Sequence, residues 1–346
     1  MPEGRASFPE IFARLETRTL DPGGVRDAFV AILEGAWTPV QIGAFATALR
    51  LQGESAEIIV AAAEALRAVM TPVHHGLDEV VDTCGTGGDG AHTLNVSTAA
   101  AIVVAACGPH VAKHGNRSVS SRCGSADVVA ALGIPIDVEP ARQHEVLGEA
   151  RIAFLMAPAH HPALRHAAQA RRELGLRTIF NALGPLVNPA RATHQLVGVY
   201  DDALRPIMAA ALGRLGVRRA WVVRSEDGLD EISPSAPTRV SLLADDGTIS
   251  ERIVEPADFG VERISLAALR GGDAAENAAA IATLLDGGGH PALLAIVLNA
   301  AAALALVRGG DLRACAEEAR AAIDSGRAKR TLDTWQRVAR RAKEPA

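Results

Sequence analysis

A glycine-dense loop followed by amide and hydroxyl side chains is the part of this chain best suited to chemistry. Residues 82–98 read DTCGTGGDGAHTLNVST, which is a strand end, the loop, and the start of an alanine-rich helix. Glycines let the backbone approach phosphate oxygens, and a helix start presents unpaired N–H groups and the positive end of the helix dipole. The predicted backbone cradle is Gly85, Gly87 and Gly88, and the predicted donors at the helix start are Asn95, Ser97 and Thr98.

A second polar loop follows at residues 113–127, KHGNRSVSSRCGSAD, again between a strand-like run and a helix. Lys113 supplies a point charge for a phosphate, and His114 and Asn116 place polar groups beside it. Two such loops, about one helix apart, predict an extended phosphorylated ligand at the carboxyl ends of parallel strands. The further donors of this loop are Arg117, Ser118, Ser120, Ser121, Gly124 and Ser125.

Three carboxylates stand out beside these loops. Asp89 would repel a phosphate, so a metal ion or a sugar hydroxyl is expected next to it. Asp230 and Glu231 are adjacent in SEDGLDEIS. On a surface such a pair is most often only solvated, but beside a pyrophosphate-like ligand it predicts an oxygen-rich site for a hard cation, to which the Ser97 hydroxyl can add. The pair His160-His161 lacks Cys or carboxylate neighbours at ligand spacing, so zinc is not expected.

Two further side chains have competing interpretations. Arg171, followed by Arg172, lies on a predicted helix, where solvent exposure is the usual state of an arginine. An arginine turned into a cleft would instead bind a planar carboxylate through two parallel hydrogen bonds. Cys84 has no evident base, so we expect a packed thiol rather than a nucleophile.

The first seventy or so residues predict helices only. Phe8, Ile11 and Leu15 fall at helical spacing, Asp21-Pro22 reads as a cap followed by proline at the first helical position, and Thr38 with Gln41 has capping-box spacing. A further helix is expected from Ser55 to about Met70. Pro72 lies in the break at residues 71–76, so we expect a helical domain at residues 1–74 and a second domain at residues 75–346.

From about Glu79 onward short strand-like runs alternate with helical segments, and from Ala274 the chain is helical again. This alternation predicts an α/β domain with a mainly parallel central sheet and helices on both faces. A hairpin is expected through Asp245-Asp246-Gly247. The predicted strands contain residues 80–81, 110–112, 152–155, 196–199, 220–223, 238–243 and 248–253.

Composition narrows the function classes. The 346 residues carry 35 Lys and Arg against 40 Asp and Glu, with no basic block, so neither nucleic acid nor an anionic membrane is an expected partner. The four cysteines are scattered, and no secretory leader is evident, which favours a reducing cytoplasm. The alanine-rich stretches at 99–107 and 296–307 are too short to span a bilayer.

Several motifs together resemble one enzyme family. GTGGDG with NVST, KHGNRSVSS with GSAD, ARRELGLRTIFNALGPLVNPA and DGLDE, in this order and spacing, are similar to anthranilate phosphoribosyltransferases. The resemblance begins at AWTPVQIGAFATALRLQGES and runs to near the C-terminus. The glycine loop alone would be weak, because pyrimidine-nucleoside phosphorylases of the same fold carry a similar one. KHGN with LGPLVNPA and DGLDE is far more specific.

The resemblance implies a step of L-tryptophan biosynthesis. The amine of anthranilate attacks the anomeric carbon of 5-phosphoribosyl 1-pyrophosphate (PRPP), which gives phosphoribosyl-anthranilate and pyrophosphate. The family fold is a small helical domain hinged to a PRPP-binding α/β domain, with helices around residues 162–185 packed back on the small domain. It also implies a cytoplasmic glycosyltransferase that forms a homodimer through the helical domains and uses two Mg²⁺ per active site.

The resemblance also assigns residues, none of them a dedicated acid or base. Relatives vary at the positions of Leu94 and Leu164, which concerns details of the anthranilate channel. PRPP-binding positions are Gly85, Gly87, Gly88, Asp89, Thr93, Asn95, Val96, Ser97, Thr98, Lys113, Ser121 and Ser125. Anthranilate positions are Gly85, His114, Asn116, Pro158 and Arg171, with Arg171 facing the carboxylate, and metal positions are Ser97, Asp230 and Glu231.

Two alternatives stay open at this stage. A pyrimidine-nucleoside phosphorylase of the same fold needs only one phosphate cradle, which leaves KHGN and the pair Asp230-Glu231 unexplained. A non-catalytic nucleic-acid-binding relative would carry a basic surface and eroded motifs. The acidic balance and the intact motifs disfavour that interpretation.

Overall fold

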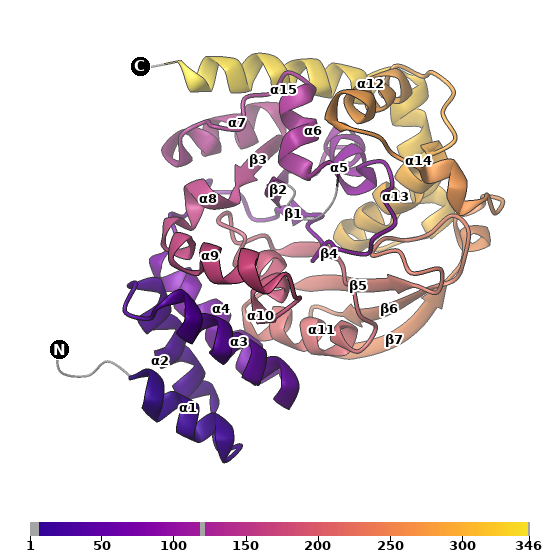
Figure 1. Ribbon diagram of the computed structural model, residues 1–346. Helices are drawn as coiled ribbons and strands as arrows, with labels where there is room; N and C mark the ends of the chain where they lie inside the picture. Colours follow the sequence, from indigo (N-terminus) through magenta and orange to yellow (C-terminus); the bar gives the residue numbers. More distant parts are fainter. Residues whose placement is uncertain (1–6, 118–121, 345–346) are drawn as a thin grey trace.

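The computed structural model describes residues 7–117 and 122–344 and begins with a layer of helices (Figure 1). The predicted helix starts are confirmed. The Thr38 hydroxyl accepts from the Gln41 backbone N–H at 3.3 Å, and the Thr38 N–H donates to Gln41 Oε1 at 2.9 Å. The Asp21 carboxylate accepts from the Gly24 N–H at 2.8 Å. These helices are α1 (Phe8–Glu16), α2 (Pro22–Leu33), α3 (Pro39–Gln52) and α4 (Ala56–Val69).

A seven-stranded sheet forms the centre of the remainder, in the order β3-β2-β1-β4-β5-β6-β7. The first five strands pair in parallel, and β6 and β7 form an antiparallel hairpin beside β5. The mainly parallel sheet and the hairpin were both predicted. The strands are β1 (Val81–Asp82), β2 (Val111–Gly115), β3 (Ile152–Met156), β4 (His194–Gly198), β5 (Arg219–Ser225), β6 (Thr238–Leu243) and β7 (Ile249–Val254).

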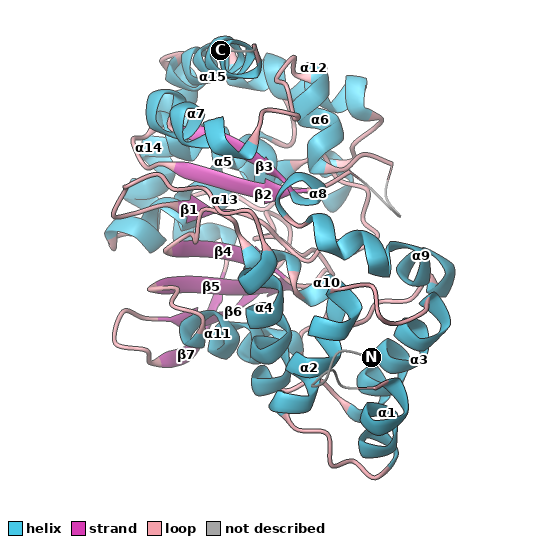
Figure 2. Cartoon of the chain, turned by 90° about the vertical axis from the view of Figure 1, so that its left-hand side faces the viewer, coloured by secondary structure: helices cyan, strands magenta, loops and turns pink. Residues whose placement is uncertain are grey.

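Successive residues of β4 and β5 face opposite sides of the sheet and belong to two separate cores. Leu196 and Trp221 lie in one core, and Val197 and Val222 lie in the other. On the first side α5 (Val96–Ala106) and α13 (Leu293–Arg308) pack on the strands; on the other side α11 (Leu204–Arg214) does so and contacts α4 (Figure 2). The helical N-terminal part therefore shares one core with one face of the sheet.

Two short helices from the middle of the chain return to the N-terminal helices. α9 (Arg165–Leu174) packs on α2 and α3, and α10 (Ile179–Ala182) packs on α3, as expected for helices around residues 162–185 (Figure 1). The other helices are α6 (Ser125–Ala131), α7 (Gln143–Ala150), α8 (Ala157–His160), α12 (Ala274–Leu285), α14 (Leu312–Asp324) and α15 (Arg327–Lys343). Short 3-10 turns are η1 (Pro140–Arg142), η2 (Pro162–Leu164), η3 (Gly184–Val187), η4 (Pro256–Phe259) and η5 (Leu266–Leu269).

Within residues 7–117 and 122–344, no single helix is long and apolar enough to cross a membrane. The pair α13 and α14 reaches the required length and composition only when taken together, and the two helices are bent by 119° at the break between them.

Candidate active site

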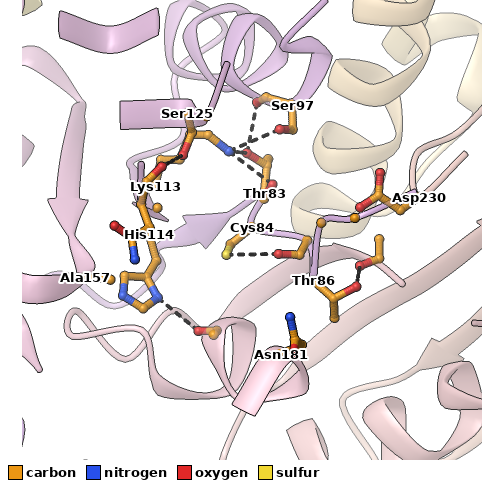
Figure 3. A pocket seen from close by; sticks show the side chains of 18 of the residues that line it. Thr83, Cys84, Thr86, Ser97, Lys113, His114, Ser125, Ala157, Asn181 and Asp230 are labelled. Carbon is orange, nitrogen blue, oxygen red and sulfur yellow. Dashed lines mark hydrogen bonds between the residues drawn. The ribbon is translucent and has the colours of Figure 1, made fainter. Parts of the chain in front are cut away.

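The two predicted loops open into one cavity of about 370 Å³ at the carboxyl ends of the parallel strands (Figure 3). β1 lies between β2 and β4, so the chain leaves the central strand toward one side and later returns on the other. Ligands of open α/β sheets bind at such a change of direction. Residues from α9, α10 and the segment before β4 close the cavity from the side of the N-terminal helices.

Lys113 places a buried positive charge at the floor of this cavity. The side chain is 2% exposed, although it is charged. Its Nζ donates to the Thr83 carbonyl at 3.2 Å, to the Thr83 hydroxyl at 3.3 Å and to the Ser97 hydroxyl at 3.3 Å (Figure 3). These partners are neutral, and a buried charge is costly without a counterion. An anion bound beside the start of α5 would therefore stabilise the buried Lys113 ammonium.

Asp82, at the end of β1, interacts electrostatically with this lysine, and Asn188 donates a hydrogen bond to its carboxylate. The buried Asp82 carboxylate accepts from Asn188 Nδ2 at 2.7 Å and from the His114 backbone N–H at 3.2 Å. Asn188 Nδ2 also donates to the Ala112 carbonyl at 2.8 Å. Burial raises the pKa of Asp82 to about 6, and the positive charge of Lys113 opposes this shift. One asparagine thus links the end of β1 to β2.

The first glycine-rich loop is fastened to the end of β4. Thr86 donates its backbone N–H to the Gly198 carbonyl at 2.8 Å, and its hydroxyl accepts from the Tyr200 N–H at 3.1 Å. Gly87 and Gly88 follow with φ of 66° and 83°, a left-handed conformation in which a side chain would be strained. At these two positions the loop lines the cavity with backbone atoms alone.

Three carboxylates line the cavity near one another. Asp89, Asp230 and Glu231 all line it, and Glu231 Oε1 accepts from the Ser97 backbone N–H at 3.1 Å. Loss of hydration, followed by repulsion from Asp89, raises the pKa of Asp230, and loss of hydration together with both neighbouring carboxylates raises that of Glu231. Groups in this situation gain most from a cation, which would neutralise them.

The donor set fits Mg²⁺ rather than zinc. It offers carboxylate oxygens and the Ser97 hydroxyl, which are hard ligands. Within the described parts of the chain, no three His, Cys, Asp or Glu side chains converge as a complete ligand group. Mg²⁺ is commonly held by one or two carboxylates and completed by water and substrate phosphates. These residues therefore suit a metal that binds together with a phosphorylated substrate.

The end of the cavity near α9 has a different character. His114 Nδ1 donates to the Gly184 carbonyl at 2.9 Å, and its ring centroid lies 5.2 Å from that of His161. Burial, and then the neighbouring His161, lower the pKa of His114 to about 3, so its ring is neutral near pH 7. The Arg171 guanidinium carbon lies 5.7 Å from the centroid of the Phe180 ring. This end combines flat apolar surface with one cation.

Arg171 is half-buried and lines the cavity, and burial lowers its pKa. It forms no ion pair with any residue of 7–117 or 122–344. Its neighbour Arg172 is exposed. A desolvated guanidinium in a cavity is suited to a carboxylate ligand.

Most predicted site residues meet in this cavity, and a few do not. Val96 and Thr98 are buried in the first turn of α5 and do not line it, although Thr98 Oγ1 has no hydrogen-bond partner among the described residues. Pro158 is exposed beside the lining residue Ala157, and Ser121 lies outside the described residues. The residues that line the cavity are Gly85, Gly87, Gly88, Asp89, Thr93, Asn95, Ser97, Lys113, His114, Asn116, Ser125, Arg171, Asp230 and Glu231.

Sequence reasoning missed the residues that hold these side chains in place. Asn299 is one of them, because its Oδ1 accepts from the Ile232 N–H at 3.0 Å and its Nδ2 donates to the Ile232 carbonyl at 2.9 Å. It fixes the chain directly after Glu231. The available signal was a single asparagine within the apolar run LLAIVLNAAAALALV of α13. Asp82, Thr83 and Asn188 lie within the quoted motifs, but nothing in those motifs indicated that they hold other side chains in place.

Comparison with known proteins agrees with this architecture. Residues 77–329 match the α/β domain of a glycosyl transferase family, and residues 11–70 match the helical bundle domain of the same family. Fold and site therefore define a glycosyl transferase with a helical bundle beside its α/β domain. The anthranilate phosphoribosyltransferase of Myxococcus xanthus is 52% identical over 302 residues, which are 87% of this chain and 89% of that protein. The chain belongs to the anthranilate phosphoribosyltransferase family.

Solved structures extend the similarity to the whole fold. The anthranilate phosphoribosyltransferase of Thermus thermophilus aligns with a TM-score of 0.90 at 38% identity and covers 95% of this chain and 99% of its own. Two structures of the Saccharomyces cerevisiae enzyme, one in complex with PRPP and Mg and one with 4-fluoroanthranilate, align with TM-scores of 0.88 at 28% identity. Each covers 97% of this chain and 99% of its own.

Proposed function

We propose that this enzyme transfers the phosphoribosyl group of PRPP to the amine of anthranilate and releases pyrophosphate, a step of L-tryptophan biosynthesis. The observation that carries the proposal is the shared cavity. It joins two phosphate-binding loops and an acidic pair at one end to a desolvated arginine beside neutral imidazole at the other. PRPP bound at the first end and anthranilate bound at the second would meet between them.

PRPP would occupy the end formed by the two loops. Backbone N–H groups of the loop around Gly87 and the start of α5 face phosphate oxygens there, and Lys113 adds a buried charge. Asp89 would accept from ribose hydroxyls or hold a metal-bound water. Thr93, Asn95, Ser97 and Ser125 complete the predicted contacts along the cavity wall, and Val96, Thr98 and Ser121 stay predictions of the family pattern.

The metal positions would be Ser97, Asp230 and Glu231, with Mg²⁺ as the ion and two ions per site as part of the proposal. When bound, Mg²⁺ would neutralise pyrophosphate charge and so favour its departure. The raised pKa values of Asp230 and Glu231 support this, because these carboxylates are desolvated near one another. The hydrogen bond from Ser97 to Glu231 would keep the carboxylate beside the start of α5.

Anthranilate would lie at the other end, with its carboxylate toward Arg171 and its ring beside His114 and Asn116. The guanidinium next to the Phe180 ring matches a flat aromatic acid in both charge and shape. Pro158 is exposed near Ala157, so its predicted contact would need the α8 region to close over the substrate. The 4-fluoroanthranilate complex of the yeast relative supports an aromatic acid at such a site.

Catalysis in this arrangement rests on positioning and charge stabilisation rather than on a general base. An aryl amine is already nucleophilic, and the difficult step is cleavage of the anomeric C–O bond, which places negative charge on pyrophosphate. Lys113 and the loop amides are placed to stabilise that charge. His114, with a pKa of about 3, is too weakly basic to serve as a proton acceptor at neutral pH.

We also propose a homodimer through the helical domain. Val40 and Leu51 of α3 are 82% and 80% exposed, and Leu176 nearby is 57% exposed. Val40 and Leu51 are eleven residues apart, which is about three helical turns, so they share one face of α3. An exposed apolar face of this kind is typical of an interface. Light scattering of wild type and of Leu51→Glu would test it, with the substitution expected to produce monomers.

Two further proposals concern the domain boundary and the cellular location of the enzyme. We place the domain boundary at 74/75, which agrees with family matches at residues 11–70 and 77–329. We place the enzyme in the cytoplasm, because its four cysteines are scattered without a C-x-x-C pair.

One pair of assays tests the activity against the nearest alternative. Purified enzyme is mixed with PRPP, anthranilate and Mg²⁺, and pyrophosphate is measured; a parallel reaction contains thymidine and inorganic phosphate. We expect pyrophosphate release only when anthranilate is present and no thymine from thymidine. Phosphate-dependent thymidine cleavage without anthranilate transfer would replace the proposal by a nucleoside phosphorylase.

A further inference from the structure

A segment far along the chain forms backbone hydrogen bonds with the end of the first glycine-rich loop. It comprises residues 269–277, which connect η5 to α12. The Leu94 N–H donates to the Leu269 carbonyl at 2.8 Å, and the Gly271 N–H donates to the His92 carbonyl at 2.9 Å. Thr93 and Arg270 form an isolated antiparallel bridge between these contacts. The end of the loop is therefore paired like a short strand before it enters α5.

Gly271 allows this pairing because the two backbones come very close. A Cβ atom at Gly271 would lie 2.7 Å from the Thr93 carbonyl oxygen and 2.8 Å from the Leu94 nitrogen. Both are backbone atoms, which cannot rotate away. Any side chain at this position would displace the loop.

Asn277, in the first turn of α12, connects this segment to Asn95, a predicted PRPP-binding residue. It is 3% exposed. Its Oδ1 accepts from the Gly272 N–H at 2.7 Å, and its Nδ2 donates to Asn95 Oδ1 at 3.0 Å. The Gly272 N–H fixes the orientation of the amide, because a backbone N–H requires an acceptor. The NH₂ group must then face Asn95.

Asn95 and Asn277 both contact Cys123 of the second loop. With Asn95 Oδ1 turned toward Asn277, Asn95 Nδ2 faces the Cys123 carbonyl at 3.4 Å, and the Cys123 thiol lies 3.4 Å from Asn95 Oδ1. Asn95 and Cys123 line the cavity, whereas Asn277 does not. One buried amide therefore sets the orientation of the side chain that joins the two loops.

We propose that Asn277 is a positioning residue for PRPP, acting through its contacts with Asn95 and Cys123 to hold the two phosphate-binding loops in place; this rests on the proposed function. The segment at residues 269–277 would thus be part of the PRPP site without contacting the substrate. Anthranilate binding at the far end of the cavity would not depend on it.

The informative variant is Asn277→Asp. It has nearly the same shape and still accepts from the Gly272 N–H, but it replaces the donor that faces Asn95 Oδ1 by a second acceptor. The Kd of PRPP with Mg²⁺, measured by titration calorimetry, is expected to rise about 10-fold or more, because a buried acceptor loses its donor. The KM of PRPP should rise alike, while the KM of anthranilate changes less than about twofold. Asn277→Ala is expected to follow the same pattern.

Glu276→Ala is the matched control. Glu276 accepts from the Asp273 N–H at 2.9 Å at the start of the same helix and does not contact Asn95. It should lower Tm without changing the Kd of PRPP. Equal rises in Kd for Glu276→Ala and Asn277→Asp, or an Asn277→Asp protein with lower Tm and normal Kd, would overturn the proposal.

Calorimetry separates this proposal from the proposed reaction. A wild type that binds PRPP but transfers nothing to anthranilate would refute the reaction and still allow the role of Asn277 to be judged from Kd. A wild type that does not bind PRPP would refute both.

Discussion

The backbone N–H of Ser97 donates to Oε1 of Glu231 at 3.1 Å, although 134 residues separate them. This contact brings the start of α5, where we propose that phosphates bind, against the acidic pair, where we propose that Mg²⁺ binds. Lys113 Nζ lies 3.3 Å from the Ser97 hydroxyl on the other side. The Lys113 ammonium, the Ser97 hydroxyl and the carboxylates of Asp230 and Glu231 therefore surround the place where we propose that pyrophosphate binds. Substitutions at these residues test the proposal.

Replacement of the acidic pair by Asp230→Asn with Glu231→Gln should lower kcat/KM for PRPP by at least ~10²-fold, because loss of a few kcal/mol of transition-state stabilisation has this effect. A Mg²⁺ titration of the rate should also shift to higher concentration. The control is Glu226→Gln, an exposed carboxylate that pairs with Arg239 at 3.4 Å. A doubly substituted enzyme with ordinary PRPP kinetics would remove these residues from the metal site.

Lys113→Ala should reduce kcat/KM for PRPP by a similar ~10²-fold, because it removes the buried charge that we propose stabilises the leaving pyrophosphate. Steady-state kinetics with varied PRPP would measure this. The KM of anthranilate should not change, since Lys113 lies at the end of the cavity that we propose binds PRPP. A variant with unchanged PRPP parameters would show that the anion sits elsewhere.

Arg171→Ala should mainly raise the KM of anthranilate, by about 10-fold or more, because a charge-assisted contact to its carboxylate is lost. The neighbouring Arg172 is exposed, so Arg172→Ala serves as the control and should behave like wild type. If Arg171→Ala altered only the PRPP parameters, anthranilate could not bind at this end of the cavity.

The buried histidines should contribute a loss of stability in mild acid. Burial and neighbouring charge lower the pKa of His114 to about 3 and that of His161 to about 4, from an ordinary 6.5. Between pH 6.5 and 4 the unfolded chain binds more protons at these rings than the folded protein, so the free energy of unfolding decreases as pH falls.

Urea unfolding at pH 8 and pH 5 would measure this loss, and His161→Phe should make it smaller. Asp82, Asp230 and Glu231 work in the opposite direction, because burial raises their pKa values and their protonation favours the folded state as pH falls. The comparison between wild type and His161→Phe isolates the imidazole contribution. An identical loss in both proteins would show that His161 does not titrate as inferred.

Local signals explain what could be predicted from the sequence. Helix starts such as Thr38 with Gln41 depend on residues three positions apart, and the parallel strands have recognisable apolar runs. The glycine loop and KHGN were likewise local patterns. Their convergence followed from the rule that parallel strands bring their carboxyl ends to one edge.

The supports of the site were not predictable in this way. Asn188 reaches Asp82 across 106 residues, and Asn277 reaches Asn95 across 182 residues. Such contacts depend on how whole elements pack, and a single asparagine in a helix or loop does not indicate its partner. Pro158 shows the converse, because a matching motif does not by itself place a side chain in the cavity of the described structure.

The fluorescence of anthranilate offers the most direct test of the proposed transfer. Enzyme, PRPP and Mg²⁺ are mixed with anthranilate, and emission is followed with time. We expect a steady loss of anthranilate fluorescence that requires all three other components and slows by ~10²-fold with Lys113→Ala. Constant fluorescence in the complete mixture, or a loss that proceeds without PRPP, would contradict phosphoribosyl transfer to anthranilate.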